Sequence, residues 1–180
     1  MTPVLRNRLI GVAIAFAIYA ADQVVKWWVD GPLGLKRQHD KMDLLPFFDL
    51  YRIHNYGVSL GMFEATSPET RWLLVGVTAL IALLVTVWMF REKLLGDILG
   101  LSLILGGALG NIKDRYELGY VLDYADFHIG DFRPFLIFNI ADAAITIGVV
   151  IILARAFFMS DKEVDDMMDG KTADAAESNT

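Results

Sequence analysis

Four stretches of this chain are long and apolar enough to cross a bilayer, and they constrain its fold more than any other feature. A helix needs roughly 20 mostly apolar residues to span ~30 Å of hydrocarbon. Residues 72–90 hold no charged side chain, whereas residues 9–29, 94–112 and 135–158 carry polar or charged interruptions. With 55% hydrophobic and 21% charged residues, the 180-residue chain is too apolar for an ordinary soluble domain. We therefore expect an all-α integral membrane protein with four transmembrane helices.

The first apolar segment has a second interpretation. Arg6 and Arg8 precede it and small residues lie near its end, as in a secretory signal peptide. The segment nevertheless continues through Asp22 and Lys26 to Trp27 without a turn signal, which favours a helix ending in an aromatic interfacial belt. We interpret it as a span.

Four spans place both termini on the same side of the membrane. Lys and Arg are divided almost evenly between the two sides, so a raw count does not give the orientation. Bases close to span ends in short segments carry more weight, and the pairs Arg6/Arg8 and Arg91/Lys93 are of this kind. We expect cytoplasmic termini, with the loops 30–71 and 113–134 on the other face.

The long first loop contains an apolar, partly alternating stretch from Leu44 to Ile53, followed by a glycine-containing turn. This pattern predicts a small β-like cradle on the membrane surface, and we also expect a surface helix in the same loop. Ser67 as N-cap and Pro68 at the first helical position predict the start of the next helix.

The last 21 residues differ in composition from the rest. Residues 160–180 contain seven acids and two bases, which accounts for most of the net charge of -6. We interpret them as an acidic, disordered, cytoplasmic tail that follows a membrane domain of residues 1–159, with a binding role as the alternative. Nothing in the chain is basic enough to suggest nucleic acid. The lack of cysteine excludes thiolate catalysis and Cys-bound zinc or iron–sulfur centres.

Charged residues inside membrane spans are costly and are functional candidates by default. Asp22 and Lys26 are spaced i, i+4 on the first span and could equally form a structural ion pair. After a glycine-rich stretch, Asn111, Asp114 and Arg115 would share one face if the third helix continues that far. The alternative is that these side chains only satisfy the unpaired backbone groups at the end of the helix.

A second group of acids is harder to explain structurally. Asp123 follows the third span, while Asn139 and Asp142 lie one turn apart within the predicted fourth span. With no base within two turns, Asp142 must be paired across helices, hydrogen-bonded or protonated, and Asp123, Asp114 or the amides are the candidates to meet it. Two adjacent carboxylates share a proton, so one can activate water while the other protonates a carbonyl oxygen, as in aspartic proteases.

Two other functions stay open at this point. The aspartates could form a proton relay in a small proton-coupled carrier, or the glycine-rich face could bind partner helices in a non-catalytic scaffold. His39, His54 and His128 lack the spacing of metal ligands, so we predict no metal site and no cofactor.

Five segments in this order resemble the lipoprotein signal peptidases, the type II signal peptidases of bacteria. They are Asp22–Lys26, Asn55–Gly61, Gly106–Arg115, Gly119–Phe127 and Phe138–Ala143. The resemblance covers most of residues 9–158.

The resemblance implies an aspartic endopeptidase of the bacterial inner membrane. Such an enzyme removes the signal peptide of diacylglyceryl-modified prolipoproteins on the N-terminal side of the lipidated cysteine and is inhibited by globomycin. The implied catalytic pair is Asp123 and Asp142. We expect the substrate-binding or site-supporting residues to be Asn111, Asp114, Arg115, Asn139, Asn55, Gly57, Asp22 and Lys26.

The resemblance also implies a location and partners. The active site would lie near the periplasmic face, with the cradle in the periplasm and both termini in the cytoplasm. Prolipoproteins and membrane lipid would be its partners, and we expect a monomer.

Overall fold

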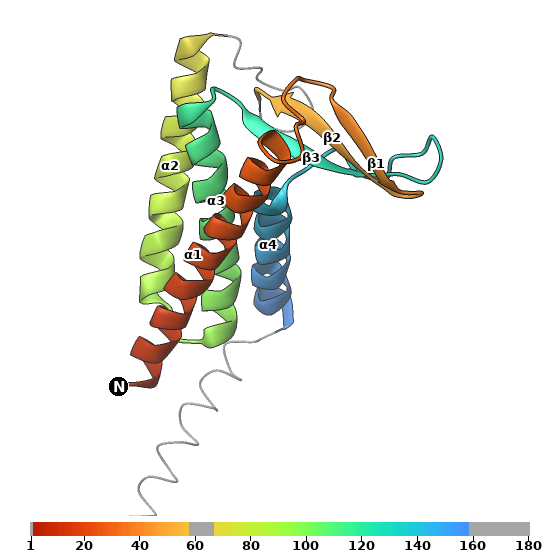
Figure 1. The fold of residues 1–180 in the computed structure, drawn as a ribbon. Helices are drawn as coiled ribbons and strands as arrows, with labels where there is room; N and C mark the ends of the chain where they lie inside the picture. The colour runs from red at the N-terminus through yellow and green to blue at the C-terminus, as the bar shows by residue number, and fades with distance from the viewer. Residues whose placement is uncertain (1, 58–66, 159–180) are drawn as a thin grey trace, which may run out of the picture.

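The computed structural model describes residues 2–57 and 67–158 as a four-helix bundle with a small sheet at one end (Figure 1). All four helices are long and apolar enough to cross a membrane, which confirms the predicted architecture. The elements in chain order are α1 (Pro3–Asp30), β1 (Lys41–Leu45), β2 (Phe48–Asn55), α2 (Pro68–Arg91), α3 (Leu95–Glu117), β3 (Val121–Phe127) and α4 (Ile140–Phe158). The predicted acidic tail lies outside the described residues.

Helix α3 is the centre of the bundle, because it packs against α1, α2 and α4. In the apolar stretch of α3 half of the residues are buried, compared with 11% in that of α2. Glycines allow the close contacts: a Cβ at Gly106 would lie 2.5 Å from the carbonyl oxygen of Ala15, and one at Gly107 would clash with that of Ala141. Small residues at such positions let membrane helices approach to backbone contact.

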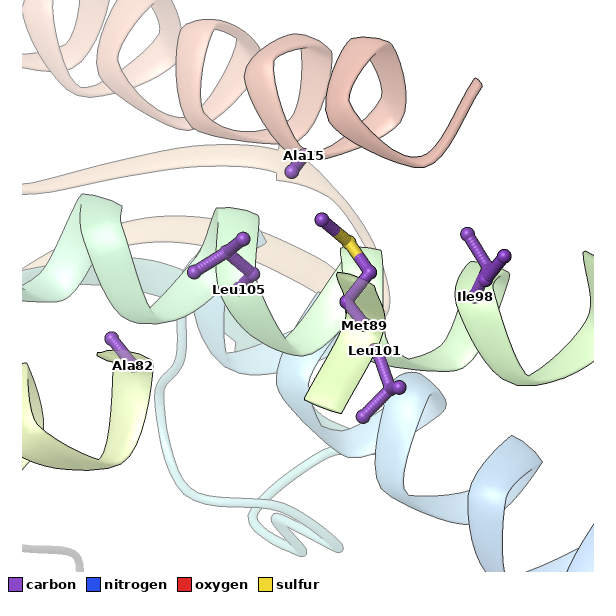
Figure 2. Packing of buried hydrophobic residues seen from close by; sticks show 6 residues of the cluster. All are labelled: Ala15, Ala82, Met89, Ile98, Leu101 and Leu105. Carbon is purple, nitrogen blue, oxygen red and sulfur yellow. The ribbon is translucent and has the colours of Figure 1, made fainter. Parts of the chain in front are cut away.

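The bundle is apolar inside and outside. A buried cluster joins α1, α2 and α3 around Met89, which is completely buried (Figure 2); its members are Ala15, Ala82, Met89, Ile98, Leu101 and Leu105. Helix α2 also exposes a series of large apolar side chains, among them Leu73, Leu80, Leu83 and Leu84. This outer surface suits contact with lipid chains.

Two helix boundaries affect the polar residues. Helix α3 continues to Glu117, so Asn111, Asp114 and Arg115 lie within it, whereas the expected span ended at residue 112. Helix α4 begins at Ile140 and not at residue 135. The placement of Asn139 inside the fourth span was therefore wrong. Phe138 is held in an extended backbone by pairing with Ala125, which delays the start of the helix.

The start of α2 follows the sequence prediction. The Ser67 hydroxyl accepts a hydrogen bond from the Thr70 amide at 3.3 Å, the Thr70 hydroxyl bonds back to the Ser67 amide, and Pro68 opens the helix. This capping box satisfies amides that have no partner within the helix.

The predicted β-like cradle is a three-stranded antiparallel sheet in the order β1-β2-β3. Strands β1 and β2 come from the first loop as expected, but β3 was not predicted as a strand. Residues 31–57 form strands and turns without a helix, so the expected surface helix does not occur there; residues 58–66 lie outside the described part of the loop. The sheet sits at the end of the bundle opposite the N-terminus (Figure 1).

Arg52 fastens the sheet to the bundle. Its buried guanidinium on β2 donates to Asp30 at the end of α1 and to the Leu35 carbonyl, each at 2.5 Å, and to the Tyr120 hydroxyl at 3.1 Å. Charge-assisted bonds of this kind are stronger than neutral ones. They hold β2, and hence the neighbouring β3, in a defined position over the helix ends.

We expect Gly106→Ala to destabilise the protein by about 1–3 kcal/mol, because its Cβ would overlap the backbone of α1. Gly76→Ala on α2 is the matched control, since nothing lies within 4 Å of the added Cβ. Thermal unfolding in detergent should show a lower Tm for Gly106→Ala alone. Equal Tm values for the two variants would contradict the close packing of α1 on α3.

Candidate active site

Asp123 lies on β3 and is held from two directions. In the β2–β3 pairing Ile53 is opposite Asp123 and Asn55 is opposite Val121, so Asn55 is the diagonal neighbour of Asp123 on the same face and donates from Nδ2 to its Oδ2 at 3.0 Å. Asn139 Nδ2 donates to the other carboxyl oxygen at 2.6 Å. The Asp123 side chain is 3% exposed. Its carboxyl group is therefore fixed in a buried, hydrogen-bonded position.

Asp142 lies in the first turn of α4. Asn139 precedes the helix, and its Oδ1 accepts from the Asp142 amide at 2.9 Å while Asp142 Oδ2 accepts from the Asn139 amide at 3.4 Å. This reciprocal arrangement is a capping box, and it ties both side chains to the helix start. Asn111 Nδ2 on α3 donates to Asp142 Oδ1 at 2.8 Å. Asp142 is only partly buried and so remains accessible.

The Asn139 side chain brings the two aspartates together. Its Nδ2 donates to Asp123 and its Oδ1 accepts from the amide of Asp142. The pairing of Phe138 with Ala125 places Asn139 beside β3 and makes this double contact possible. Of the candidates to meet Asp142, the two amides bond to it directly and Asp123 is joined to it through Asn139, whereas Asp114 makes its contacts elsewhere.

The surroundings of the two carboxyl groups differ. Burial, reinforced by the negative charge of Asp142, raises the pKa of Asp123 to about 7. Asp142 lies in the first turn of α4 and is only partly buried. The burial of Asp123 therefore favours its protonated form below about pH 7.

Arg115 and Asn55 hold the turn that follows β2. The Arg115 guanidinium donates to the Gly57 carbonyl at 2.9 Å, and Asn55 Oδ1 accepts from the Gly57 amide at 3.1 Å. Arg115 on α3 thus contacts the backbone just after β2. Because Asn55 also donates to Asp123, the position of this turn is coupled to the carboxyl group.

The remaining predicted residues form a second polar cluster next to the aspartates. Lys26 Nζ lies 2.8 Å from Asp22 and 2.7 Å from Asp114, which confirms the i, i+4 pair and adds a third member. All three side chains are almost completely buried. A triad of charges at this depth between helices is held by mutual pairing.

Two contributors were not predicted from the sequence. Gln23 Nε2 donates to Asp22 at 3.2 Å and to Asp114 at 3.1 Å. Arg71, at the start of α2, donates to the carbonyls of Arg115 and Tyr116 and so caps the end of α3. Gln23 lies between Asp22 and Lys26 in the sequence, and this position could have indicated its contact with the charged cluster. No local pattern reveals the contact of Arg71 with the Arg115 carbonyl, because the two residues are 44 positions apart in the sequence.

Within residues 2–57 and 67–158 no group of three or more His, Asp or Glu side chains is arranged to hold a metal ion. The chemistry that this part of the chain offers is that of two carboxyl groups with unlike environments. Such a pair can move a proton to and from a water molecule and a carbonyl group.

The family model for signal peptidase (SPase) II matches residues 14–158. The chain belongs to the signal peptidase II family. It is 52% identical over 161 residues to the lipoprotein signal peptidase of Sphingopyxis alaskensis, with 89% of this chain and 91% of that protein covered. The lipoprotein signal peptidase of Rhizorhabdus wittichii is 49% identical over 158 residues, which cover 88% of this chain and 91% of that protein.

Two solved structures of a bacterial membrane enzyme have the same fold. The structure at 2.3 Å resolution is 28% identical with a TM-score of 0.70, and covers 84% of this chain and 92% of that chain. The structure at 1.9 Å is 27% identical with a TM-score of 0.71, with 84% and 94% covered. Membership of the signal peptidase II family, together with four spanning helices, makes this chain a multi-pass membrane peptidase.

We expect Asp123 to titrate with a pKa of about 7, because it is buried beside the charge of Asp142. Carbon-13 NMR of protein labelled at the aspartate carboxyl carbons measures this, with Asp123→Asn identifying the signal. Asp142→Asn removes the neighbouring negative charge and should lower the pKa of Asp123. A pKa near 3.8, or one that Asp142→Asn leaves unchanged, would contradict this account of the pair.

Proposed function

We propose that this chain removes the signal peptide from diacylglyceryl-modified prolipoproteins, using Asp123 and Asp142 to activate water. Its relatives are named lipoprotein signal peptidases, which supports the substrate class. The observation that carries the mechanism is the Asn139 side chain in contact with both aspartates, one deeply buried and one partly accessible. These are the two environments that an acid and a base at one site require.

The proposed reaction follows from the unlike carboxyl groups. Asp142 accepts a proton from a water molecule as the water oxygen attacks the scissile carbonyl carbon, and Asp123 donates its proton to the carbonyl oxygen. The product of this step is a neutral gem-diol. Asp142 then gives its proton to the leaving nitrogen as the C–N bond breaks, and a gem-diol hydroxyl returns a proton to Asp123. Both groups end in their starting states.

The other polar residues have positioning roles in this proposal. Asn139 orients the two aspartates, and Asn111 fixes the rotamer of Asp142 through its 2.8 Å hydrogen bond. Asn55, Gly57 and Arg115 hold the turn beside Asp123 in a fixed position. Both aspartates and these partners come from one chain, which supports a monomer as the functional unit.

The position of the site suits a lipid-anchored substrate. It lies where α3 and β3 meet the start of α4, at the bundle end that bears the sheet (Figure 1). The acyl chains of a substrate can remain in lipid there while its extended backbone is accommodated next to protein. Below the site the buried cluster around Met89 and Leu101 is apolar, which favours a one-sided hydrolase over a carrier with access from both faces.

We further propose that the sheet lies in the periplasm and that both termini lie in the cytoplasm of a bacterial inner membrane. Arg6 and Arg8 lie near the start of α1, and Arg91 and Lys93 lie between α2 and α3. Both pairs are at the bundle end away from the sheet (Figure 1). The positive-inside rule assigns that end to the cytoplasm.

Cleavage of a diacylglyceryl-modified prolipoprotein by the purified protein in detergent tests the proposal. We expect Asp123→Asn and Asp142→Asn each to lower kcat by at least about 10²-fold, the loss typical for removal of a general acid or base. Globomycin should block the wild type. Asp43→Asn on β1 is the matched control, because its side chain is 80% exposed, and it should retain full activity. Cleavage by Asp123→Asn or Asp142→Asn at the wild-type rate would refute the mechanism. A proton-flux assay would then test the alternative of a proton-coupled carrier.

The pH profile gives a second test. Asp123 must be protonated to donate, and its pKa of about 7 means that the competent fraction is lost as the pH rises through this value. We therefore expect kcat/KM, which reports the free enzyme, to fall above about pH 7 and to approach a tenfold loss per pH unit. A kcat/KM that still rises between pH 7 and pH 9 would show that Asp123 does not act as the acid.

A further inference from the structure

The buried cluster around Lys26 reaches the backbone next to both proposed catalytic aspartates. Asp22 Oδ1 on α1 accepts a hydrogen bond at 3.0 Å from the amide of Ala141, the residue before Asp142. Asp114 Oδ2 on α3 accepts one at 3.1 Å from the amide of Leu122, the residue before Asp123. Asp22 and Asp114 therefore each hold the backbone one residue before Asp142 or Asp123, the proposed catalytic dyad.

A single ammonium group joins these two acids. Lys26 Nζ lies 2.8 Å from Asp22 Oδ2 and 2.7 Å from Asp114 Oδ2, and it also donates to Asn111 Oδ1 at 3.4 Å. Asn111 in turn donates to Asp142. The side chains of Lys26, Asp22 and Asp114 are 6%, 0% and 4% exposed, so water does not stand in for any of these contacts.

The packing of α1 on α3 is built around this cluster. A Cβ at Gly110 would lie 2.6 Å from Asp22 Oδ2, so a glycine is needed for the carboxylate to reach its place. Gln23 Nε2 donates to both acids and closes the cluster on the remaining side. The arrangement links α1, α3, β3 and the start of α4.

We propose that Lys26 is a positioning residue, which sets the separation of Asp123 and Asp142 through Asp22, Asp114 and the two backbone amides that they hold. This inference rests on the proposed function of the dyad. Without the ammonium group, two buried carboxylates would face each other unpaired, and one would have to take up a proton or move apart. An uncharged carboxyl group is a weaker acceptor, so the peptide that it holds would lose part of its restraint.

Lys26→Met is the first variant, because methionine fills a similar volume without the charge. A displacement of reacting groups by about 1 Å costs roughly 10² in rate, so we expect kcat to fall about 10²-fold while KM changes less than about threefold. Arg155→Met is the matched control. It breaks the Arg155–Asp97 pair that joins α4 and α3, at 2.8 Å, far from the dyad along both helices. It should lower the Tm and leave kcat unchanged.

A pair of substitutions at Asp114 tests the backbone contact and does not depend on the folding of Lys26→Met. Asp114 Oδ2 makes the contacts with Lys26 and Leu122, whereas Oδ1 accepts from Gln23, a contact that Asp114→Asn gives up. Asp114→Asn therefore keeps an acceptor for the Leu122 amide and leaves Lys26 paired with Asp22. We expect its kcat within about tenfold of wild type, and that of Asp114→Leu lower by a further factor of about ten or more.

The outcomes separate this inference from the proposed function. If Asp123→Asn and Asp142→Asn are inactive but Lys26→Met keeps its kcat within about threefold of wild type, the positioning role is wrong and the dyad stands. Equal kcat values for Asp114→Asn and Asp114→Leu, or a loss in Arg155→Met as large as in Lys26→Met, would overturn the positioning role in the same way. Cleavage by the dyad variants would instead remove the proposed function on which it rests.

Discussion

The hydrogen bonds of the Asn139 side chain hold together the two parts of the molecule that make up the site. One end of its amide belongs to the start of α4, where it caps the helix, and the other end reaches the carboxyl group of Asp123 on β3. The cap satisfies a helix amide that would otherwise lack a partner, and the same group sets where the strand lies against the helix. The side chain is completely buried, so no water competes for these bonds. These bonds join the proposed catalytic aspartates directly through one side chain.

The bilayer explains why the polar residues gather at one end of the bundle. Charged groups are costly in hydrocarbon, and Asp22, Lys26 and Asp114 are tolerated because they pair with each other and with backbone amides at the level of the sheet. The apolar cluster around Met89 and the apolar outer surface of α2 occupy the rest of the span. An enzyme whose substrate is anchored in lipid needs this division, because the scissile bond must meet water while the anchor stays in the membrane. The glycines of α3 make the bundle compact, since they allow Asp22 and the backbones of α1 and α4 to approach α3 closely.

The predictions from the sequence agree with the structure where they depend on residues close together in the chain, and fail where they depend on distant ones. The spans, the capping of α2 by Ser67 and the i, i+4 pair of Asp22 and Lys26 depend on residues close in sequence, and each is present as predicted. Strand β3 was missed because its burial on both faces removes the alternation by which an exposed strand is recognised. The late start of α4 was missed because Phe138 is drawn into an extended backbone by Ala125, a partner 13 residues away across a loop. Asp114 was a candidate partner for Asp142, but Lys26 on another helix takes it instead.

The sequence by itself determined that the chain crosses a membrane four times, because no other arrangement satisfies the backbone of such long apolar segments in lipid. It also marked Asp142 as needing a partner or a function, because a carboxyl group within a span is costly, and the resemblance to lipoprotein signal peptidases paired it with Asp123. Only the tertiary structure decided how these groups are arranged. The bulged register of β2 on β3 places Asn55 next to Asp123, and the crossing of α1, α3 and α4 places Lys26 between two acids. These contacts join residues up to 119 positions apart, as between Ala141 and Asp22, and local periodicity carries no information about them because it reports only which face of an element is buried.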